Sequence, residues 1–308
     1  MDQSKTMISH FGGQNRSKTF ASVLMLKTNL TAVLAHGRKP FVHVHTWFPC
    51  YAHDSNAVVS SIMKVLRDVE QNGGPPPKLR IQADNCWREN KNRFVFALAA
   101  LLVKFGFFQE VEFGFMLQGH THTDVDAVFS HFSRKLRMHD ASTMSDVFAI
   151  VASSQQEHQC CTFMEEIDDW REAVMPYLVK SMTGHTRPHS FRFYMEEDNP
   201  VFQWKQYCNS PEWSSPVYCF NRDLNGGYDG PQWPFEPRPV RPDMMNRDFV
   251  GGTEGVKMFV SWLDSKKHEW AGMKDTVSFN KENALSHWKN FLAKIESFDD
   301  VKTEDQHL

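Results

Sequence analysis

Hydrophobic and polar positions follow two different periods along the first half of the chain. Residues 41–48 alternate β-forming side chains with smaller polar ones up to Pro49, which predicts a strand. Behind Asp54 and Ser55 the apolar residues recur at helical spacing until Asn72-Gly73-Gly74, which predicts a helix that one of these two residues caps. The apolar positions of this helix are Val58, Val59, Ile62, Val65, Leu66 and Val69.

The same reasoning extends the pattern in both directions. Strands are expected at 79–84 and 111–117, and helices at 90–105 and 126–137. Ahead of residue 41, the apolar stretch 21–34 is interrupted at Lys27-Thr28-Asn29, which suits a hairpin or two short strands. The order is strand, strand, strand, helix, strand, helix, strand, helix. A mixed five-stranded α/β sheet with this order is the ribonuclease H topology, and its second half requires parallel strands joined by helices.

The composition changes beyond residue 140. Helices are expected at 143–153, 165–180 and 284–295, short strands at 191–194, 201–207 and 216–220, and an extended loop rich in Gly, Pro and aromatic residues at 225–241. We therefore divide the chain into a ribonuclease-H-like core (1–140), a helical extension (141–185), a small β-rich and irregular region (186–300) and a disordered tail (301–308).

Composition and charge narrow the class of protein. The formal net charge of the 308 residues is -3, so contacts with nucleic acid must come from local patches. Residues 1–6 are polar and no signal-peptide core follows them, and the longest apolar run, 94–103, is too short for a membrane span. The six cysteines form no CxxC pair. We expect an intracellular protein with reduced thiols and no membrane partner.

One candidate for chemistry follows the strand expected at 79–84. Asp84 ends this strand, and Glu89, Asn90, Lys91, Asn92 and Arg93 lead into the next helix. Open α/β sheets place ligands at the carboxyl ends of strands, so an acid here is a candidate metal ligand. The plainer alternative, which spacing alone favours, is a helix cap followed by a charged and solvated first turn.

A second candidate follows the strand expected at 111–117. His120, His122, Asp124 and Asp126 lie within seven residues, directly before a helix. Carboxylate oxygens are the ligands that Mg²⁺ and Mn²⁺ prefer, whereas imidazoles suit zinc or acid–base roles. A capped helix with a polar entry loop is the alternative. If both loops converge, Asp84, Asp124 and Asp126 share a pair of divalent cations, as two-metal phosphoryl transfer requires.

The two candidate segments, around Asp84 and around Asp126, also resemble a known family of proteins. Asp84-Asn85-Cys86 with Glu89-Asn90-Lys91-Asn92, and Gly119-His120-Thr121-His122 with Asp126 and Phe129-Ser130, resemble a family of uncharacterised, transposon-derived eukaryotic proteins. Met1 to Thr6 matches a string common in that family, and the similarity spans the first half of the chain, with a looser part at 191–213. The resemblance implies a ribonuclease-H-like transposase or integrase-type domain that acts on DNA, and with it a nuclear location and a homo-oligomer.

Carried onto this chain, the resemblance implies a role for each residue. Asp84 is the acid of the fourth strand and Asp126 the acid that enters the last core helix. The first strand of that fold donates another carboxylate. The resemblance implies that this strand is truncated here, because Met1 falls where it should end, and Asp2 is the only nearby acid. Mg²⁺ or Mn²⁺ on these acids would activate water or a DNA 3′-hydroxyl. His120 or His122 would orient phosphate or water, and Lys91, Arg93, Asn90 and Asn92 would bind the substrate.

Two alternatives remain. His43 and His45 lie on one face of a predicted strand, so together with His120 and His122 they could form a zinc site, although satisfied histidines are the default. The string of residues 119–122 also resembles a metal-binding motif of calcineurin-like phosphoesterases, but the companion motifs of that class are absent.

The other alternative is a catalytically inactive, domesticated transposase core that binds nucleic acid or protein, which the incomplete first strand and the acidic net charge favour.

Overall fold

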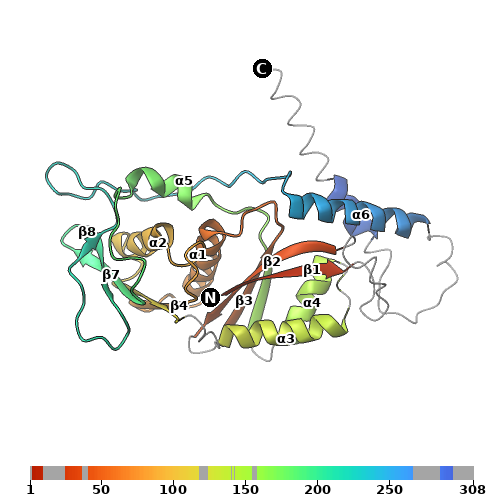
Figure 1. Ribbon diagram of the computed structural model, residues 1–308, viewed down its shortest axis with the longest axis horizontal. Coiled ribbons are helices and arrows are strands. Elements are labelled where there is room, and N and C mark those ends of the chain that lie inside the picture. Colours follow the sequence, from red (N-terminus) through yellow and green to blue (C-terminus); the bar gives the residue numbers. More distant parts are fainter. Residues whose placement is uncertain are drawn as a thin grey trace, which may run out of the picture.

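The computed structural model describes residues 2–9, 25–36, 41–117, 124–139, 141, 143–154, 158–265 and 285–293. These residues form a mixed α/β structure in which two β-sheets are flanked by helices (Figure 1). The predicted α/β class is therefore confirmed, and from residue 41 to residue 138 the order strand, helix, strand, helix, strand, helix agrees with the sequence pattern.

The first sheet, here called sheet A, contains four strands in the order β1-β2-β3-β6. These are β1 (Asp2–Ser9), β2 (Met25–Ala35), β3 (Phe41–Trp47) and β6 (His158–Phe163). The first three pair antiparallel, and β6 runs parallel to β3. β1 runs for eight residues from Asp2, whereas the family resemblance implied a first strand that is almost finished at Met1.

The interruption expected at Lys27-Thr28-Asn29 does not occur. β2 is one continuous strand, and these three residues pair with Met7, Thr6 and Lys5 of β1. Thr28 and Asn29 are buried, at 0% and 2% exposed. Tertiary pairing overrides the weak local preference of the polar residues, so the expectation of a hairpin was wrong.

The second sheet, sheet B, has five strands in the order β4-β5-β7-β8-β9. They are β4 (Lys78–Ala83), β5 (Glu110–Phe115), β7 (Ser190–Glu196), β8 (Asn199–Lys205) and β9 (Val217–Tyr218). β4 and β5 are parallel, as expected, and the remaining pairs are antiparallel.

The expectation of one five-stranded sheet requires correction. β4 and β5 do not join the first three strands: β3 pairs with β6 in sheet A, and β5 pairs with β7 in sheet B. Both of these partner strands come from sequence beyond residue 140. The hydrogen bonds of each edge are satisfied by late segments of the chain, which periodicity in the first half does not reveal.

Six α-helices are also present, and the bounds of α1 to α4 differ from the predicted ones by up to three residues. They are α1 (Ser55–Gln71), α2 (Arg93–Lys104), α3 (Asp124–Met138), α4 (Met144–Ser154), α5 (Trp170–Val174) and α6 (Arg247–Ser265). Residues 285–293 are also helical. Only α5 and a 3₁₀ turn (Met175–Tyr177) form in the range 165–180, where a longer helix was expected. Neither β6 nor α6 was predicted.

Helix α2 covers one face of sheet B. Its Phe96 is fully buried and contacts the rings of Phe113 in β5, Phe191 in β7 and Phe202 in β8. Burying a large aromatic side chain of this kind stabilises a fold by about 2–3 kcal/mol. β7 and β8, beyond residue 185, are thus part of the same core as β4 and β5 (Figure 1).

Sheet A is covered on both faces. Val42 and Val44 of β3 pack with Val125 and Val128 of α3, together with residues of α4 and α6. The alternate residue His43 faces α1, where its Nε2 lies 3.7 Å from Asp68. Helices α3 and α1 therefore lie on opposite sides of sheet A (Figure 1). The contacts of α6 also cross the boundaries that we expected at residues 140 and 185.

Candidate functional site

The acid expected at the end of β4 lies in a loop that binds itself. Asp84 directly follows β4, and its Oδ1 accepts a hydrogen bond from the backbone N–H of Cys86 (3.0 Å) and another from Nδ2 of Asn90 (2.5 Å). The backbone N–H groups of Asn90 and Lys91 in turn donate to the carbonyl of Cys86 (both 2.9 Å). The carboxylate of Asp84 therefore organises the turn from β4 to α2 and does not itself cap the helix.

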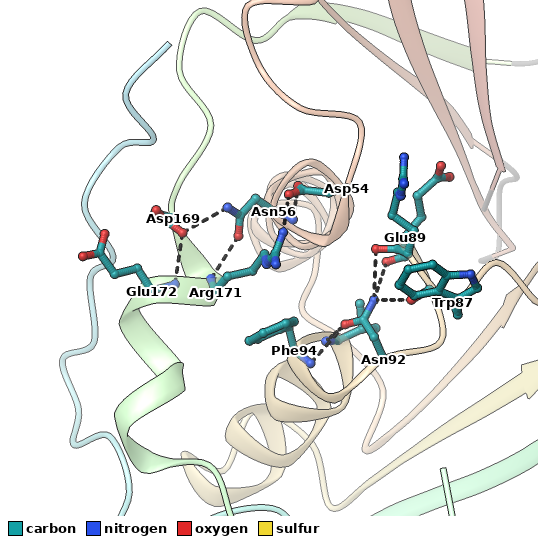
Figure 2. A network of polar contacts seen from close by, with 11 residues as sticks. Asp54, Asn56, Trp87, Glu89, Asn92, Phe94, Asp169, Arg171 and Glu172 are labelled. Atoms are coloured by element: carbon teal, nitrogen blue, oxygen red, sulfur yellow. Dashed lines mark hydrogen bonds and ion pairs between the residues drawn. The ribbon is translucent and has the colours of Figure 1, made fainter. Parts of the chain in front are cut away.

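Asn92 closes the same loop from its other end. Its Oδ1 accepts from the N–H groups of Phe94 (3.0 Å) and Val95 (3.2 Å), so it is the N-cap of α2. Its Nδ2 lies 3.1 to 3.3 Å from the carbonyl oxygens of Trp87, Arg88 and Glu89 (Figure 2). One side chain thus supplies both the helix cap and the loop's internal bonds.

The loop presents an aromatic ring to solvent. Trp87 is 72% exposed, and the guanidinium of Arg88 lies 5.9 Å from the centre of its ring. Because Asn92 bonds the carbonyl of Trp87, the backbone that carries this ring is fixed. An exposed tryptophan beside a cation on a rigid loop is a surface that can stack on a flat ligand.

Lys91 and Asn90 are buried, which corrects their expected role in binding substrate. Lys91 is 4% exposed, and its Nζ lies 5.4 Å and 5.9 Å from the ring centres of Phe115 and Phe191. Burial lowers the pKa of this ammonium to about 8. Within the described residues, neither Lys91 Nζ nor Asn90 Oδ1 has a hydrogen-bond partner. A side chain so placed supports the core and does not reach a phosphate.

Arg93 faces a different surface. Its guanidinium lies 5.8 Å from the ring centre of Phe94, and its Nη2 is 3.7 Å from the sulfur of Met175. The side chain of Arg93 is half-buried. Among the described residues it makes no contact with the carboxylate of Asp84.

A second polar network lies at the start of α1, and the sequence pattern did not reveal it. Asp54 caps α1 and its Oδ2 forms an ion pair with Arg171 (2.8 Å), while Asn56 Nδ2 donates to Asp169 (3.0 Å). The backbone N–H of Arg171 donates to Asn56 Oδ1 (3.0 Å). Figure 2 shows this network beside the one at Asn92. The partners are more than a hundred residues apart, so only the cap of Asp54 could be predicted.

The two networks are linked. The Arg171 guanidinium lies 5.1 Å from the ring centre of Phe94, in the first turn of α2. His53, directly before Asp54, has its Nδ1 3.2 Å from Glu89 of the loop, and its ring is 5.8 Å from that of Trp47 at the end of β3. The carboxyl ends of β3 and β4 therefore meet at the starts of α1 and α2.

Of the second predicted cluster, only Asp124 and Asp126 lie within the described residues. His120 and His122 lie outside the described residues. Asp124 and Asp126 occupy the first turn of α3, where a carboxylate is favourable for the helix dipole. Asp124 is exposed, and its Oδ2 lies 3.8 Å from His36 Nε2, just beyond the end of β2.

These contacts place the two acid clusters apart. His36 follows Ala35, which pairs with Phe41 at the start of β3, whereas Glu89 meets His53 beyond the end of β3. The strand between them spans roughly 20 Å at about 3.3 Å per residue. Glu89 of the Asp84 loop contacts His53, directly before α1, whereas Asp126 lies on α3, on the other side of sheet A from α1.

The described part of the chain offers no assembled metal site. No group of three or more His, Cys, Asp and Glu side chains among these residues could hold an ion. Asp2 begins β1 opposite Ala32 of β2. The structure brings Asp84 together with Asn90, and no contact joins it to Asp124 or Asp126 in the described ranges.

The two histidines of β3 share a face as expected. Their ring centres are 6.3 Å apart, and both are buried. Burial lowers the pKa of His43 against the opposing effect of Asp68, and burial lowers the pKa of His45 to about 3. Both rings are therefore neutral at neutral pH. The proposed zinc partners, His120 and His122, lie outside the described residues.

With this geometry in hand, the chain can be compared with known families. A family model described as a domain of unknown function, DUF7869, matches residues 18–210. The chain belongs to this family. The DUF7869 match runs from before β2 to beyond β8 and includes the loop of Asp84, α3 and α5. No curated protein and no solved structure matches the chain. No helix in the described part of this DUF7869 protein is long and apolar enough to cross a bilayer.

Proposed function

We propose that this DUF7869 protein is a nucleic-acid-binding module on a ribonuclease-H-like scaffold derived from a transposase, and that Asp84 and Asp126 do not make it a nuclease. The order of elements through α3 supports the scaffold. The division of the strands between two sheets is a departure from it. A nuclear location belongs to the same proposal.

The observation that carries the proposal is the bonding of Asp84. Its carboxylate accepts from Cys86 and Asn90 within its own loop, and the helix that bears Asp126 lies on the opposite side of sheet A. A catalytic carboxylate needs oxygens turned to a shared ion, as two-metal phosphoryl transfer requires. Here the same residue types build a rigid loop instead.

What the rigid loop presents fits a nucleic acid. Trp87 is 72% exposed, so a base can stack on its ring, and Arg88 beside it supplies a cation for a phosphate. Stacking of a base on an aromatic side chain contributes about 1–3 kcal/mol. Because Asn92 fixes the backbone of the loop, little conformational entropy is lost on binding.

The test measures the binding of labelled single-stranded and duplex oligonucleotides to the protein by fluorescence anisotropy, in a buffer that contains EDTA. Trp87→Ala should weaken binding at least about 5-fold, the low end of the stacking contribution. Trp233→Ala, which removes another exposed tryptophan on a different surface, should leave binding unchanged. Equal affinities of wild type and Trp87→Ala, or no binding by wild type, would overturn the proposal.

A second candidate is the metal-dependent nuclease. The positions of two residues favour it: Asp84 directly follows β4, and Asp126 lies in the first turn of α3, which follows the parallel neighbour of β4. In this reading Mg²⁺ or Mn²⁺ would be held by Asp84, Asp126 and a first-strand acid, and would activate water on a phosphodiester. It predicts cleavage of DNA with Mn²⁺ that Asp84→Asn abolishes without unfolding the protein.

A further inference from the structure

Helix α2 covers one face of sheet B, and part of the other face, here called the open face, is uncovered. Phe113, Phe191 and Phe202 point to α2, so the alternate residues of the same strands point away from it. Gly114 lies on the open face near the end of β5, opposite Ser190 of β7, and a Cβ built on it would meet no heavy atom within 4 Å. The described part of the chain therefore places nothing over this position of β5.

Arg192 of β7 is held on the open face between two aromatic rings. Its guanidinium lies 4.5 Å from the ring centre of Trp213 and 5.4 Å from that of Tyr194. Its Nε and Nη2 donate to Oε1 of Gln203 in the neighbouring strand (2.9 and 2.5 Å). A side chain fixed in this way loses little rotamer freedom when it binds a ligand.

Lys205 of β8 adds a second cation at the same place. Its Nζ lies 4.5 Å from the ring centre of Trp213 and donates to the carbonyl of Cys208 (3.1 Å). Beside it Tyr207, 46% exposed, stacks on His189 with ring centres 5.8 Å apart. The ring of Trp213 and the two cations thus lie together at the Lys205 end of the open face, and the ring of Tyr194 lies next to Arg192.

The cationic side chains on the open face differ in whether a carboxylate pairs with them. Lys78 and Arg80 of β4 are paired with Glu110 and Glu112 at 2.9 Å and 2.8 Å, so their charges are compensated. Neither Arg192 nor Lys205 has an ion pair with a carboxylate in the described ranges. Their charges remain available to an anionic ligand.

We infer that this end of the open face binds single-stranded nucleic acid. Arg192 and Lys205 would take phosphates, and bases would stack on Tyr194, Tyr207 and Trp213. A flat sheet with aromatic rings and cations suits unpaired bases, whose faces are accessible, and not a duplex, whose bases are stacked on each other. The inference rests on the proposed function for the class of ligand and assigns it a surface separate from Trp87.

The test measures affinity for a labelled oligo(dT) strand and a hairpin duplex, in EDTA and over a range of salt concentrations. Arg192→Gln with Lys205→Gln should weaken oligo(dT) binding about 10-fold or more and reduce the salt slope by about 1.4, since each lost phosphate contact on a single strand contributes about 0.7. The matched control is Lys257→Gln with Lys289→Gln, which removes two exposed lysines elsewhere. The control should bind like wild type.

The outcomes separate this inference from the proposed function. If Trp87→Ala weakens binding while the Arg192 and Lys205 double variant behaves like its control, the inference is wrong and the proposed function stands. If wild type binds neither probe, the proposed function is wrong. Tighter binding of an acidic peptide than of oligo(dT), lost in the double variant, would overturn the inference in favour of a protein partner. Should the double variant unfold, Lys205→Gln alone carries the test with a slope change of about 0.7.

Discussion

The side-chain amide of Asn90 donates to the carboxylate of Asp84 at 2.5 Å across the turn that joins β4 to α2. Asn90 is 1% exposed, so this donor has lost its water and depends on the carboxylate. The bond gives the acid a structural purpose that is independent of any metal.

Asp84→Ala should destabilise the protein by about 2 kcal/mol, because it leaves the Cys86 N–H and the buried Asn90 amide without their acceptor. The control is Asp124→Ala, whose side chain is 78% exposed and should change stability by less than about 0.5 kcal/mol. Urea unfolding followed by circular dichroism measures both. Equal effects of the two changes would contradict the structural role of Asp84.

Asn92 offers a test of the loop's internal bonds apart from the helix cap. Asp caps helices as well as Asn does, so Asn92→Asp keeps the bonds to Phe94 and Val95 but replaces the donor that faces three carbonyls with an anion. We expect a loss of about 1–3 kcal/mol in the free energy of unfolding. An Asn92→Asp protein as stable as wild type would show that these three contacts contribute nothing.

Lys91 should make stability depend on pH in the alkaline range. The folded pKa of about 8 lies below the ordinary 10.5, so the penalty for a buried ammonium is present below pH 8 and is relieved as the pH rises from 8 to 10.5. Wild type should gain up to about 3 kcal/mol over this range relative to Lys91→Met. Urea midpoints at pH 7.5 and 10 measure the difference. If the stabilities of wild type and Lys91→Met changed with pH in the same way, Lys91 would not be a desolvated lysine.

His45 should make the stability of the protein depend on pH in the acid range. Its folded pKa of about 3 lies below the ordinary 6.5, so the unfolded chain takes up a proton first, and stability falls as the pH drops from 6.5 toward 3. The full effect is up to about 5 kcal/mol, and His45→Leu should remove it. Unfolding midpoints between pH 4 and 7 show the slope of each protein. His43, whose pKa is also lowered, should leave a residual slope in His45→Leu.

The sequence predicted the elements whose signals are local. The helix behind Asp54 runs as α1, and Asp54 is its cap, because the apolar spacing and the capping residue both lie within that segment. The strands that became β4 and β5 were placed within a residue or two, and their parallel pairing follows from the helix between them.

Elements that depend on distant partners were missed. β6 has no alternating pattern of its own and forms because the edge of β3 is free to pair with it. α6 contains Gly251, Gly252 and Gly255, which weaken its helical propensity, and it is stabilised by packing of Phe249, Val256 and Phe259 on sheet A. For the site, local sequence located Asp84, but the partners of Asn56 and Glu89 could not be inferred from spacing.

The most direct test of the account compares binding and cleavage of one labelled single-stranded oligonucleotide, in EDTA and in Mn²⁺. Wild type, Asp84→Asn, Trp87→Ala and the exposed control Glu254→Gln would be measured in parallel. The account predicts equal binding with and without metal, an intact oligonucleotide, and a loss of affinity in Trp87→Ala alone. Cleavage that requires Mn²⁺ and disappears in Asp84→Asn, but not in Glu254→Gln, would contradict it.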